Sequence, residues 1–207
     1  MLLNGKRGLT WLLAEYGISA DRLPAIAGEY LGKGLVICGD AACVWADLET
    51  YGCRSDEFGG SVAKTGFDFM TVNKMVETFP GVIEHAYCNN AHVLRLFRDA
   101  RRQEYEQFRL MHLHACQAGG QWLWPWPGSG TSGLGATITG VALGYLPVVL
   151  CGMPLDDGPH NGEPHWRRTK FASSEAAGKD GGPDQHWKRA IEAFRGIVHS
   201  MSGRTQE

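Results

Sequence analysis

Short apolar runs alternate with segments of helical spacing along most of the chain. The runs predict buried strands at 35–38, 67–72, 82–87, 110–116 and 147–151. The apolar positions between the runs predict helices over 9–16, 21–31, 41–48, 91–108 and in the segment that Gly144 ends. Strands that alternate with helices predict an α/β fold of the Rossmann-like kind, with a mainly parallel sheet flanked by helices.

The chain beyond the last predicted strand has a different composition. Residues 157–183 are rich in Gly, Pro, Ser and charged side chains and lack periodicity, which is typical of a long lid-like loop. Asp184 follows a proline as a helix cap and predicts a C-terminal helix over 184–199. With 207 residues the chain fits a single domain whose core covers about 34–156. The segment 52–66 is rich in Gly and charge and predicts a connecting loop.

Polar side chains follow several of the predicted strands. Asp40, Asn73, Tyr87 and Asp156 each lie at or just past a strand end. Ligands of open parallel sheets bind beyond the carboxyl ends of the strands. We therefore expect these four side chains to converge on one edge of the sheet.

The strongest local motif is the glycine-rich segment 128–133, GSGTSG, which leads into a predicted helix. Glycines allow a close backbone approach, and the free N–H groups at a helix N-terminus attract an anion such as phosphate. The segment lacks the GK[ST] of a Walker A loop. An ordinary helix entry, capped by Ser or Thr, is the alternative interpretation.

Three tryptophans, Trp122, Trp124 and Trp126, alternate with other residues just before this segment. Their rings could form a stacking surface for a base or a sugar. Large aromatic side chains mostly serve in packing, so burial is the interpretation that we favour.

Two histidines at alternate positions of a predicted strand, His112 and His114, project from one face, as two metal ligands would. Further ligand types follow downstream at Asp156, Asp157, His160 and His165. None of these residues has the spacing of a known metal motif, and strand histidines are commonly packed and hydrogen-bonded. We therefore expect no metal site.

Charge and cysteine content narrow the function classes. A net charge of −2 and a pI near 6.4 give no electrostatic reason to bind nucleic acid or an anionic membrane. No apolar run approaches the roughly 18 residues that span a bilayer. The six cysteines form no CxxC pair, which favours a reducing, cytoplasmic setting. No GxSxG or Cys-His motif suggests a covalent nucleophile.

One predicted helix has a basic side that could contact phosphates. Its arginines are Arg95, Arg98, Arg101, Arg102 and Arg109. Acidic residues at 99, 104 and 106 are interleaved with them, so an ion-paired, solvated helix face is the interpretation that we favour.

Three segments together resemble a known superfamily. They are Gly130–Gly133 with the helix end Ala142–Tyr145, the strand Val149–Cys151 with its extension to Asp156, and Leu35–Asp40 followed by Phe67–Asn73. Together they resemble bacterial sialyltransferase-like proteins of the lipooligosaccharide type and the Rossmann-like domain of archaeal hydroxymethylpterin diphosphokinase. The end of the chain, Ser200–Gly203, also resembles a group of uncharacterised phage-associated proteins.

The resemblance implies a sheet that holds a nucleotide-activated donor. Gly39, Asp40, Asn73, Gly130, Thr131, Ser132 and Gly133 would surround the nucleotide. In the sialyltransferases a histidine beyond the last of these strands is the general base, and no metal is required. His165 and His160 are the first candidates for that base here, together with Asp156, and His186 is the next.

The chain departs from the family in the first loop, where an Asn-Gly-Pro-Ser-like sequence is replaced by Asp40-Ala41-Ala42-Cys43. The Asp40 carboxylate would repel phosphate but could accept ribose hydroxyls. The leading hypothesis is a glycosyltransferase-like enzyme that moves a group from a nucleotide donor, possibly a CMP-sugar, to an acceptor hydroxyl. The alternatives are a diphosphotransferase that needs Mg²⁺ on Asp156 and Asp157, and a nucleotide-binding or interaction protein without turnover.

Overall fold

The computed structural model describes residues 2–55, 62–104, 110–126, 131–154 and 182–202. Its centre is a seven-stranded sheet in which every pair of neighbouring strands is parallel. From one edge to the other the strands are β7 (Trp122–Leu123), β6 (Leu110–Ala115), β5 (Ile83–Tyr87), β4 (Phe67–Val72), β1 (Gly34–Cys38), β8 (Val148–Cys151) and β9 (Val198–Ser200). The α/β, Rossmann-like prediction is therefore confirmed.

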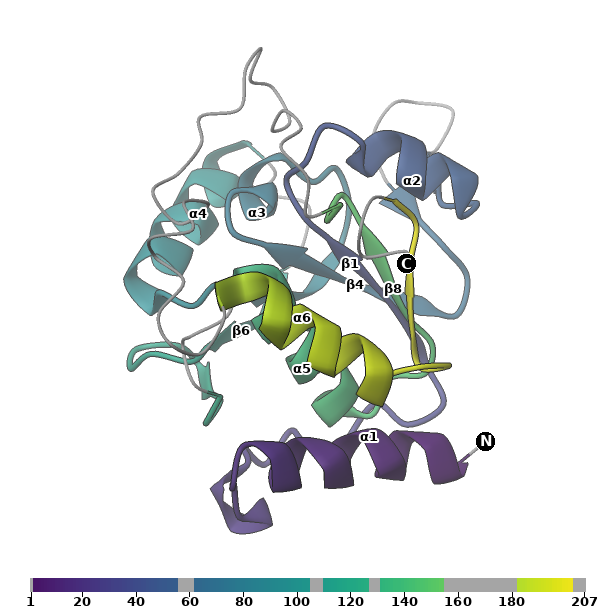
Figure 1. The fold of residues 1–207 in the computed structure, drawn as a ribbon. Helices are drawn as coiled ribbons and strands as arrows, with labels where there is room; N and C mark the ends of the chain where they lie inside the picture. Colours follow the sequence, from purple (N-terminus) through teal and green to yellow (C-terminus); the bar gives the residue numbers. More distant parts are fainter. Residues whose placement is uncertain (1, 56–61, 105–109, 127–130, 155–181, 203–207) are drawn as a thin grey trace.

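Helices cover both faces of this sheet (Figure 1). On one face lie α1 (Leu2–Glu15), α5 (Ser132–Leu143) and α6 (Gly182–Ala193). On the other lie α2 (Val44–Thr50), α3 (Met75–Thr78) and α4 (Ala91–Glu104). Because both faces are covered, the central strands are apolar throughout rather than alternating: all five residues of β1 and all four of β8 are buried.

The chain reverses its direction of travel across the sheet at β1. It first adds β4, β5, β6 and β7 on one side of β1, and α5 then returns it to place β8 on the other side. Such a topological switch point leaves a crevice at the carboxyl ends of the two strands that flank it. Here these strands are β1 and β8.

Two helical predictions needed correction, the one over 21–31 and the C-terminal one. The helix predicted over 21–31 is absent except for one 3-10 turn, η1 (Ala20–Arg22). Pro24 follows that turn, and Gly28 and Gly32 have positive φ angles of 80° and 87°, which end any helix. The C-terminal helix ends at Ala193 instead of 199, because Gly196 turns the chain at φ 77°.

Strands replace several predicted loops and ends. Val198, which lies within the predicted C-terminal helix, pairs with Val148 in β9. The predicted loop at 52–66 contains a small antiparallel hairpin of β2 (Arg54–Ser55) and β3 (Val62–Ala63). Strand β7 was not predicted at all. The proposed lid-like loop at 157–183 lies almost wholly outside the described residues.

Candidate functional site

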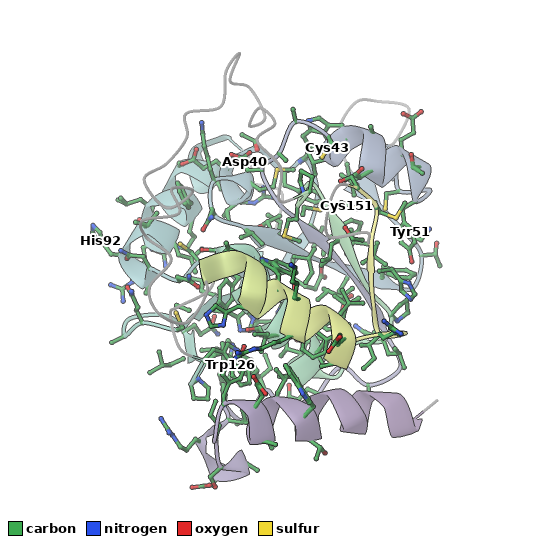
Figure 2. All side chains as sticks on the ribbon, viewed as in Figure 1. Asp40, Cys43, Tyr51, His92, Trp126 and Cys151 are labelled. Atoms are coloured by element: carbon green, nitrogen blue, oxygen red, sulfur yellow. The ribbon has the colours of Figure 1, made fainter. Side chains whose placement is uncertain are left out.

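The carboxyl edge of the sheet at β1 and β8 is the first candidate site. The two loops that leave these strands bind one another: the Gly39 amide donates to the Cys151 carbonyl at 2.8 Å, and the Ala41 amide donates to the Gly152 carbonyl at 3.2 Å. Asp40 lies between these two bonds and is half-buried at this edge, near Cys43 (Figure 2). The structure thus puts Gly39 and Asp40 at the switch point.

The start of α5 borders the same edge. Thr131 is its N-cap, and Thr131 Oγ1 accepts from the Leu134 amide at 3.2 Å and from the Trp187 indole at 3.1 Å. Ser132 Oγ accepts from the Asn89 amide at 3.4 Å, which ties the helix start to the end of β5. Two hydroxyls in the predicted phosphate site are therefore already used by the protein, as in an ordinary capped helix.

Unlike the two hydroxyls, the first two backbone amides at this helix start are, among the described residues, available to a ligand. The first amides of a helix have no acceptor within the helix. Within the described part of the chain, no acceptor is recorded for the amides of Ser132 and Gly133. These two N–H groups, with the positive end of the helix dipole, are the features here that suit an anion.

A methionine lies between the predicted glycines. A Cβ atom at Gly39 would overlap Met153 Cγ and the Gly152 carbonyl oxygen, and one at Gly133 would lie 2.8 Å from Met153 Sδ. The Met153 side chain is itself buried, at 8% exposure. Gly39 and Gly133 are thus brought together through Met153, and the space that their missing side chains leave is filled by protein.

The other predicted site residues fall into three groups. Asn73 follows β4, the neighbour of β1, in a left-handed conformation with φ 54°, and its amide donates to the Tyr87 carbonyl at 3.0 Å. Tyr87 does not face this edge: it is fully buried beneath α5, where its ring contacts Gly135. Outside the described residues lie Gly130, Asp156, Asp157, His160 and His165.

A buried carboxylate beside the switch point was missed by the sequence reasoning. Asp47 on α2 accepts from the Gly152 amide at 2.8 Å and from Ser202 Oγ at 2.7 Å, and it is only 6% exposed. It holds the end of β8 and the C-terminal segment together. Its one sequence signal is a charged residue between Val44 and Leu48 on the buried side of a short helix.

Two of the thiols near this edge, those of Cys38 and Cys151, are poor nucleophiles. Burial raises the pKa of Cys38 well above its usual value, and burial and then the Asp47 carboxylate raise the pKa of Cys151. Both thiols stay protonated at neutral pH, whereas a nucleophilic cysteine needs thiolate character.

A second polar cluster lies on the sheet face that α5 covers. Trp124 Nε1 donates to His114 Nδ1 at 2.9 Å, and His114 Nε2 lies 2.9 Å from His85 Nδ1. His85 Nε2 lies 2.8 Å from Tyr145 Oη, which donates to Asp68 Oδ2 at 2.6 Å. We call these five residues the buried chain; His85, His114 and Tyr145 have no exposed surface.

The buried chain begins beneath α5 and ends near solvent. Lys33, whose side chain is 54% exposed, pairs with Asp68 at 3.1 Å. The Tyr30 ring stacks on Tyr145 at 4.9 Å and meets the His85 ring edge-on at 4.9 Å. Burial lowers the pKa of His85 to about 3, helped by the positive charges of His112 and Lys33, and it lowers the pKa of His114 well below the usual value. Both rings are therefore neutral at pH 7.

The prediction that His112 and His114 share one face is confirmed, and so is burial for two of the tryptophans. Trp124 and Trp126 are 1% and 4% exposed and stack on each other at 5.6 Å, so they offer no surface to a base or sugar. His112 Nδ1 accepts from Trp122 Nε1 at 3.2 Å, so the same two atom types form the bond as in the pair of His114 and Trp124. Among the residues described, no three His, Cys, Asp or Glu side chains are grouped to hold a metal ion.

The arginines of α4 serve the fold more than a phosphate surface. Arg101 is 2% exposed and donates to the carbonyls of Val76, Phe79 and Gly81 at the end of α3. Arg95 donates to the Gly119 carbonyl. Of these three arginines, Arg98, which pairs with the adjacent Asp99, fits the ion-paired, solvated interpretation of this helix face, whereas the buried Arg101 does not.

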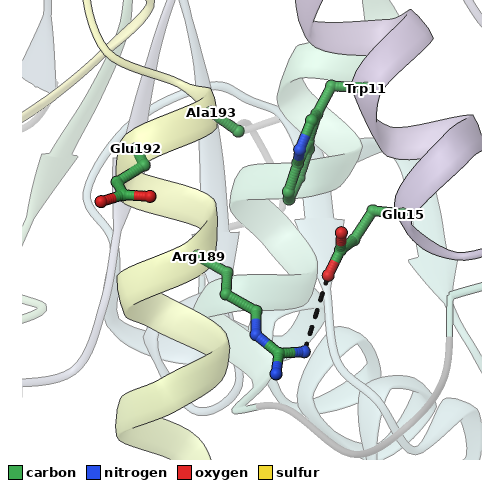
Figure 3. A pocket seen from close by; sticks show the side chains of 5 residues that line it. All are labelled: Trp11, Glu15, Arg189, Glu192 and Ala193. Atoms are coloured by element: carbon green, nitrogen blue, oxygen red, sulfur yellow. Dashed lines mark ion pairs between the residues drawn. The ribbon is translucent and has the colours of Figure 1, made fainter.

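An open groove runs between α1 and α6, lined by Trp11, Glu15, Arg189, Glu192 and Ala193 (Figure 3). Arg189 and Glu15 bridge it with an ion pair at 3.6 Å. We do not assign this groove a role.

None of the described helices is both long and apolar enough to cross a membrane. No protein-family model, curated protein or solved structure matches this chain. The proposals below therefore depend on the geometry and on the sequence resemblance alone.

Proposed function

We propose that the protein binds the phosphate of a nucleotide-activated donor at the switch point and transfers the activated group to an acceptor hydroxyl, as a glycosyltransferase does. The observation that carries this proposal is the pair of amides at Ser132 and Gly133, which have no acceptor among the described residues, at the start of a 12-residue helix that borders the crevice between β1 and β8. Backbone amides at this place in a parallel sheet suit phosphate oxygens.

Each site residue then has a separate task. The two amides hold the donor phosphate, and the Asp40 carboxylate accepts hydroxyl groups of the ribose, since its charge is unsuited to phosphate. Asn73 contributes a neutral amide from the neighbouring strand end. The base that removes the acceptor proton comes from His165 or His160, as the resemblance implies, and the nucleoside phosphate leaves with the electron pair of the broken bond.

Met153 limits where the phosphate can sit. Because its side chain fills the space between Gly39 and Gly133, a phosphate bound to the Ser132 and Gly133 amides has to lie on the solvent side of Met153 or displace it. A methionine side chain is flexible enough to move. We therefore expect Met153→Ala to bind nucleotide at least as tightly as the wild type, although it folds less stably.

A thermal-shift panel tests the proposal. Purified protein is melted with cytidine and uridine mono- and diphosphates and their sugar conjugates, with and without Mg²⁺, because a ligand of the folded state raises the Tm. Stabilisation by a nucleotide without metal supports the transferase. A strict need for Mg²⁺ favours diphosphotransfer, binding without donor consumption favours a protein without turnover, and no stabilisation by any nucleotide refutes a nucleotide site.

A further inference from the structure

The buried chain has a single hydrogen-bond direction. An indole N–H can only donate, so His114 Nδ1 must accept from Trp124 and the proton of the neutral ring is on Nε2. His114 therefore donates to His85 Nδ1, and His85 in turn donates from Nε2 to Tyr145. Tyr145 donates to Asp68, whose ionised carboxylate can only accept.

This direction leaves no place for another proton on either histidine. A proton on His114 Nδ1 would point at the Trp124 N–H group, and one on His85 Nδ1 would point at the His114 N–H group. His112 has the same restriction, because its Nδ1 accepts from Trp122. In each of the three histidines, Nδ1 can therefore take up a proton only if the hydrogen bond that it accepts breaks.

Among the described residues, no negatively charged group is placed to stabilise a positive charge on His85, at the centre of the buried chain. The Asp68 carboxylate is taken by Tyr145 and Lys33, and Tyr145 separates it from His85. Burial and the neighbouring His112 and Lys33 all oppose a charge on His85. The titratable and charged groups that face the cluster from every element packed on it are Glu29, Tyr30, Lys33, Asp68, Glu84, His85, His112, His114 and Tyr145.

The bonds that acid would break hold one segment of the chain. Residues 122–126 contribute three indoles, and each is fixed by one side chain: Trp122 by His112, Trp124 by His114, and Trp126 by Thr139 of α5 at 3.0 Å. Two of these three side-chain anchors are histidines, and the backbone of the segment is held as well, by the pairing of β7 with β6 and by the Trp124 amide, which donates to the Ala115 carbonyl at 2.9 Å. In sequence, four residues separate the end of the segment from Thr131, the N-cap of α5.

We propose that residues 122–126 form a pH-controlled strap: when His112 and His114 each take a proton from solvent on Nδ1, the indole hydrogen bonds break and the strap leaves the sheet. Release loosens the chain just before Ser132 and Gly133 and so weakens anion binding in acid. That consequence rests on the proposed function, whereas the release of the strap does not.

The size of the effect follows from proton linkage. We call the state in which the strap has left the sheet the open state. If a histidine has an ordinary pKa near 6.5 in the open state and takes up its proton only in that state, lowering the pH from 8 to 4.5 raises the open fraction roughly 100-fold. His114, which is fully buried, should give most of this factor. His112 is half-exposed and should give less.

The test is made on the full chain without any nucleotide. Hydrogen exchange of the peptide covering 116–126 and of the Trp122 and Trp124 indoles is followed from pH 8 to pH 4.5, corrected for intrinsic exchange with an unstructured reference peptide. The indole signals are assigned with Trp122→Phe and Trp124→Phe. We expect protection at the strap to fall steeply with acid, before protection in β1 and β8 falls.

His114→Gln keeps a donor and an acceptor but cannot titrate, so it should remove most of the pH dependence at Trp124. His92→Gln is the matched control, because His92 is exposed on α4 far from the strap and should behave as the wild type does (Figure 2). Strap protection that is independent of pH, or a His114→Gln protein with unchanged pH dependence, overturns the proposal.

A measurement on the wild type keeps the test decisive if the Gln variant does not fold. The imidazole ¹⁵N shifts at pH 7 should place the protons of His85 and His114 on Nε2, and the opposite tautomers refute the fixed direction. Nucleotide titrations at pH 8 and pH 5 are separate: a failure of nucleotides to bind removes the proposed function but leaves the strap result standing.

Discussion

Arg101→Met tests whether a buried arginine fastens α3 to α4. The Arg101 guanidinium donates to the carbonyls of Val76 and Phe79 at 3.1 and 2.7 Å and also to that of Gly81, and methionine keeps much of the side-chain volume without any donor. The Phe79 carbonyl, just after a four-residue helix, also accepts from the Gly81 amide at 3.1 Å, but among the described residues no backbone donor reaches the carbonyls of Val76 and Gly81. The substitution therefore leaves buried acceptors without partners.

Two opposing terms set the magnitude. Hydrogen bonds to a charged group contribute about 1.5–3 kcal/mol each, so three of them together contribute about 4.5–9 kcal/mol. Removing the buried charge recovers a desolvation penalty of several kcal/mol, so the net loss should be about 2–4 kcal/mol. For a chain of this size that corresponds to a fall in Tm of roughly 5–15 °C. Arg101→Lys, with a single ammonium group, cannot reach three carbonyls and should lose about half as much.

Urea denaturation followed by circular dichroism measures the free energy of unfolding. Arg98→Met is the matched control on the same helix, because Arg98 forms only a surface pair with Asp99 and should lose less than about 1 kcal/mol. An Arg101→Met protein within about 0.5 kcal/mol of the wild type, which is the usual scale of a surface substitution, would contradict the reasoning. Equal losses in the two variants would contradict it as well.

Three further predictions concern the site and the cluster. The pKa of His85 is about 3 in the folded chain and near 6.5 in the unfolded chain. Between these pH values the unfolded state therefore binds one proton more than the folded state. The free energy of unfolding should be largest above pH 6.5 and should fall by up to about 5 kcal/mol as the pH is lowered toward 3. His85→Gln should flatten that slope in urea titrations, and an unchanged slope would assign it to other groups. Ser132→Pro removes the amide of Ser132, and the backbone angles of Thr131, φ −68° and ψ 156°, suit a residue that precedes proline. Nucleotide affinity, measured by calorimetry, should fall tenfold or more, which is the scale of one charge-assisted hydrogen bond. Ser132→Ala keeps the amide and should lose much less affinity. Equal losses would locate the effect in the hydroxyl. Gly39→Ala should destabilise the fold by more than about 2 kcal/mol, because the added methyl group overlaps the Gly152 carbonyl oxygen, which cannot rotate away. Adding Met153→Ala should not restore the stability. If it did, the Met153 side chain would be the only obstacle.

The parts of the fold that the sequence predicted are those that depend on local pattern. The apolar runs at 35–38 and 147–151 became buried strands because both faces of a parallel sheet are covered, and Gly144 ended α5 with φ 99° because that conformation favours glycine. The helical spacing over 21–31 failed because its amides bind elsewhere: those of Gly28 and Tyr30 donate to the last carbonyls of α5. A contact with a distant helix end cannot be read from spacing.

The candidate site could be predicted only as far as strand ends define it. Asp40 and Asn73 were predicted from this rule, which needs no knowledge of strand order. The contact of Gly39 and Gly133 through Met153 depends on β8 lying next to β1, and so does the burial of Asp47. Likewise, period two places His112 and His114 on one face, but their position beside Trp122 and Trp124 depends on β7 pairing with β6.

Helix α5 explains why both polar regions have fixed positions on one rigid frame. A Cβ atom at Gly135 would overlap the Tyr87 hydroxyl, and one at Gly140 would lie 2.7 Å from a Leu35 methyl group, so these two glycines let the helix lie directly on the sheet. At its first two residues the helix presents to the carboxyl edge amides that have no acceptor among the described residues, and just past its last residue Tyr145 joins the buried chain. The position of the proposed anion site is therefore set by glycines inside the helix, not only by the glycine-rich segment before it.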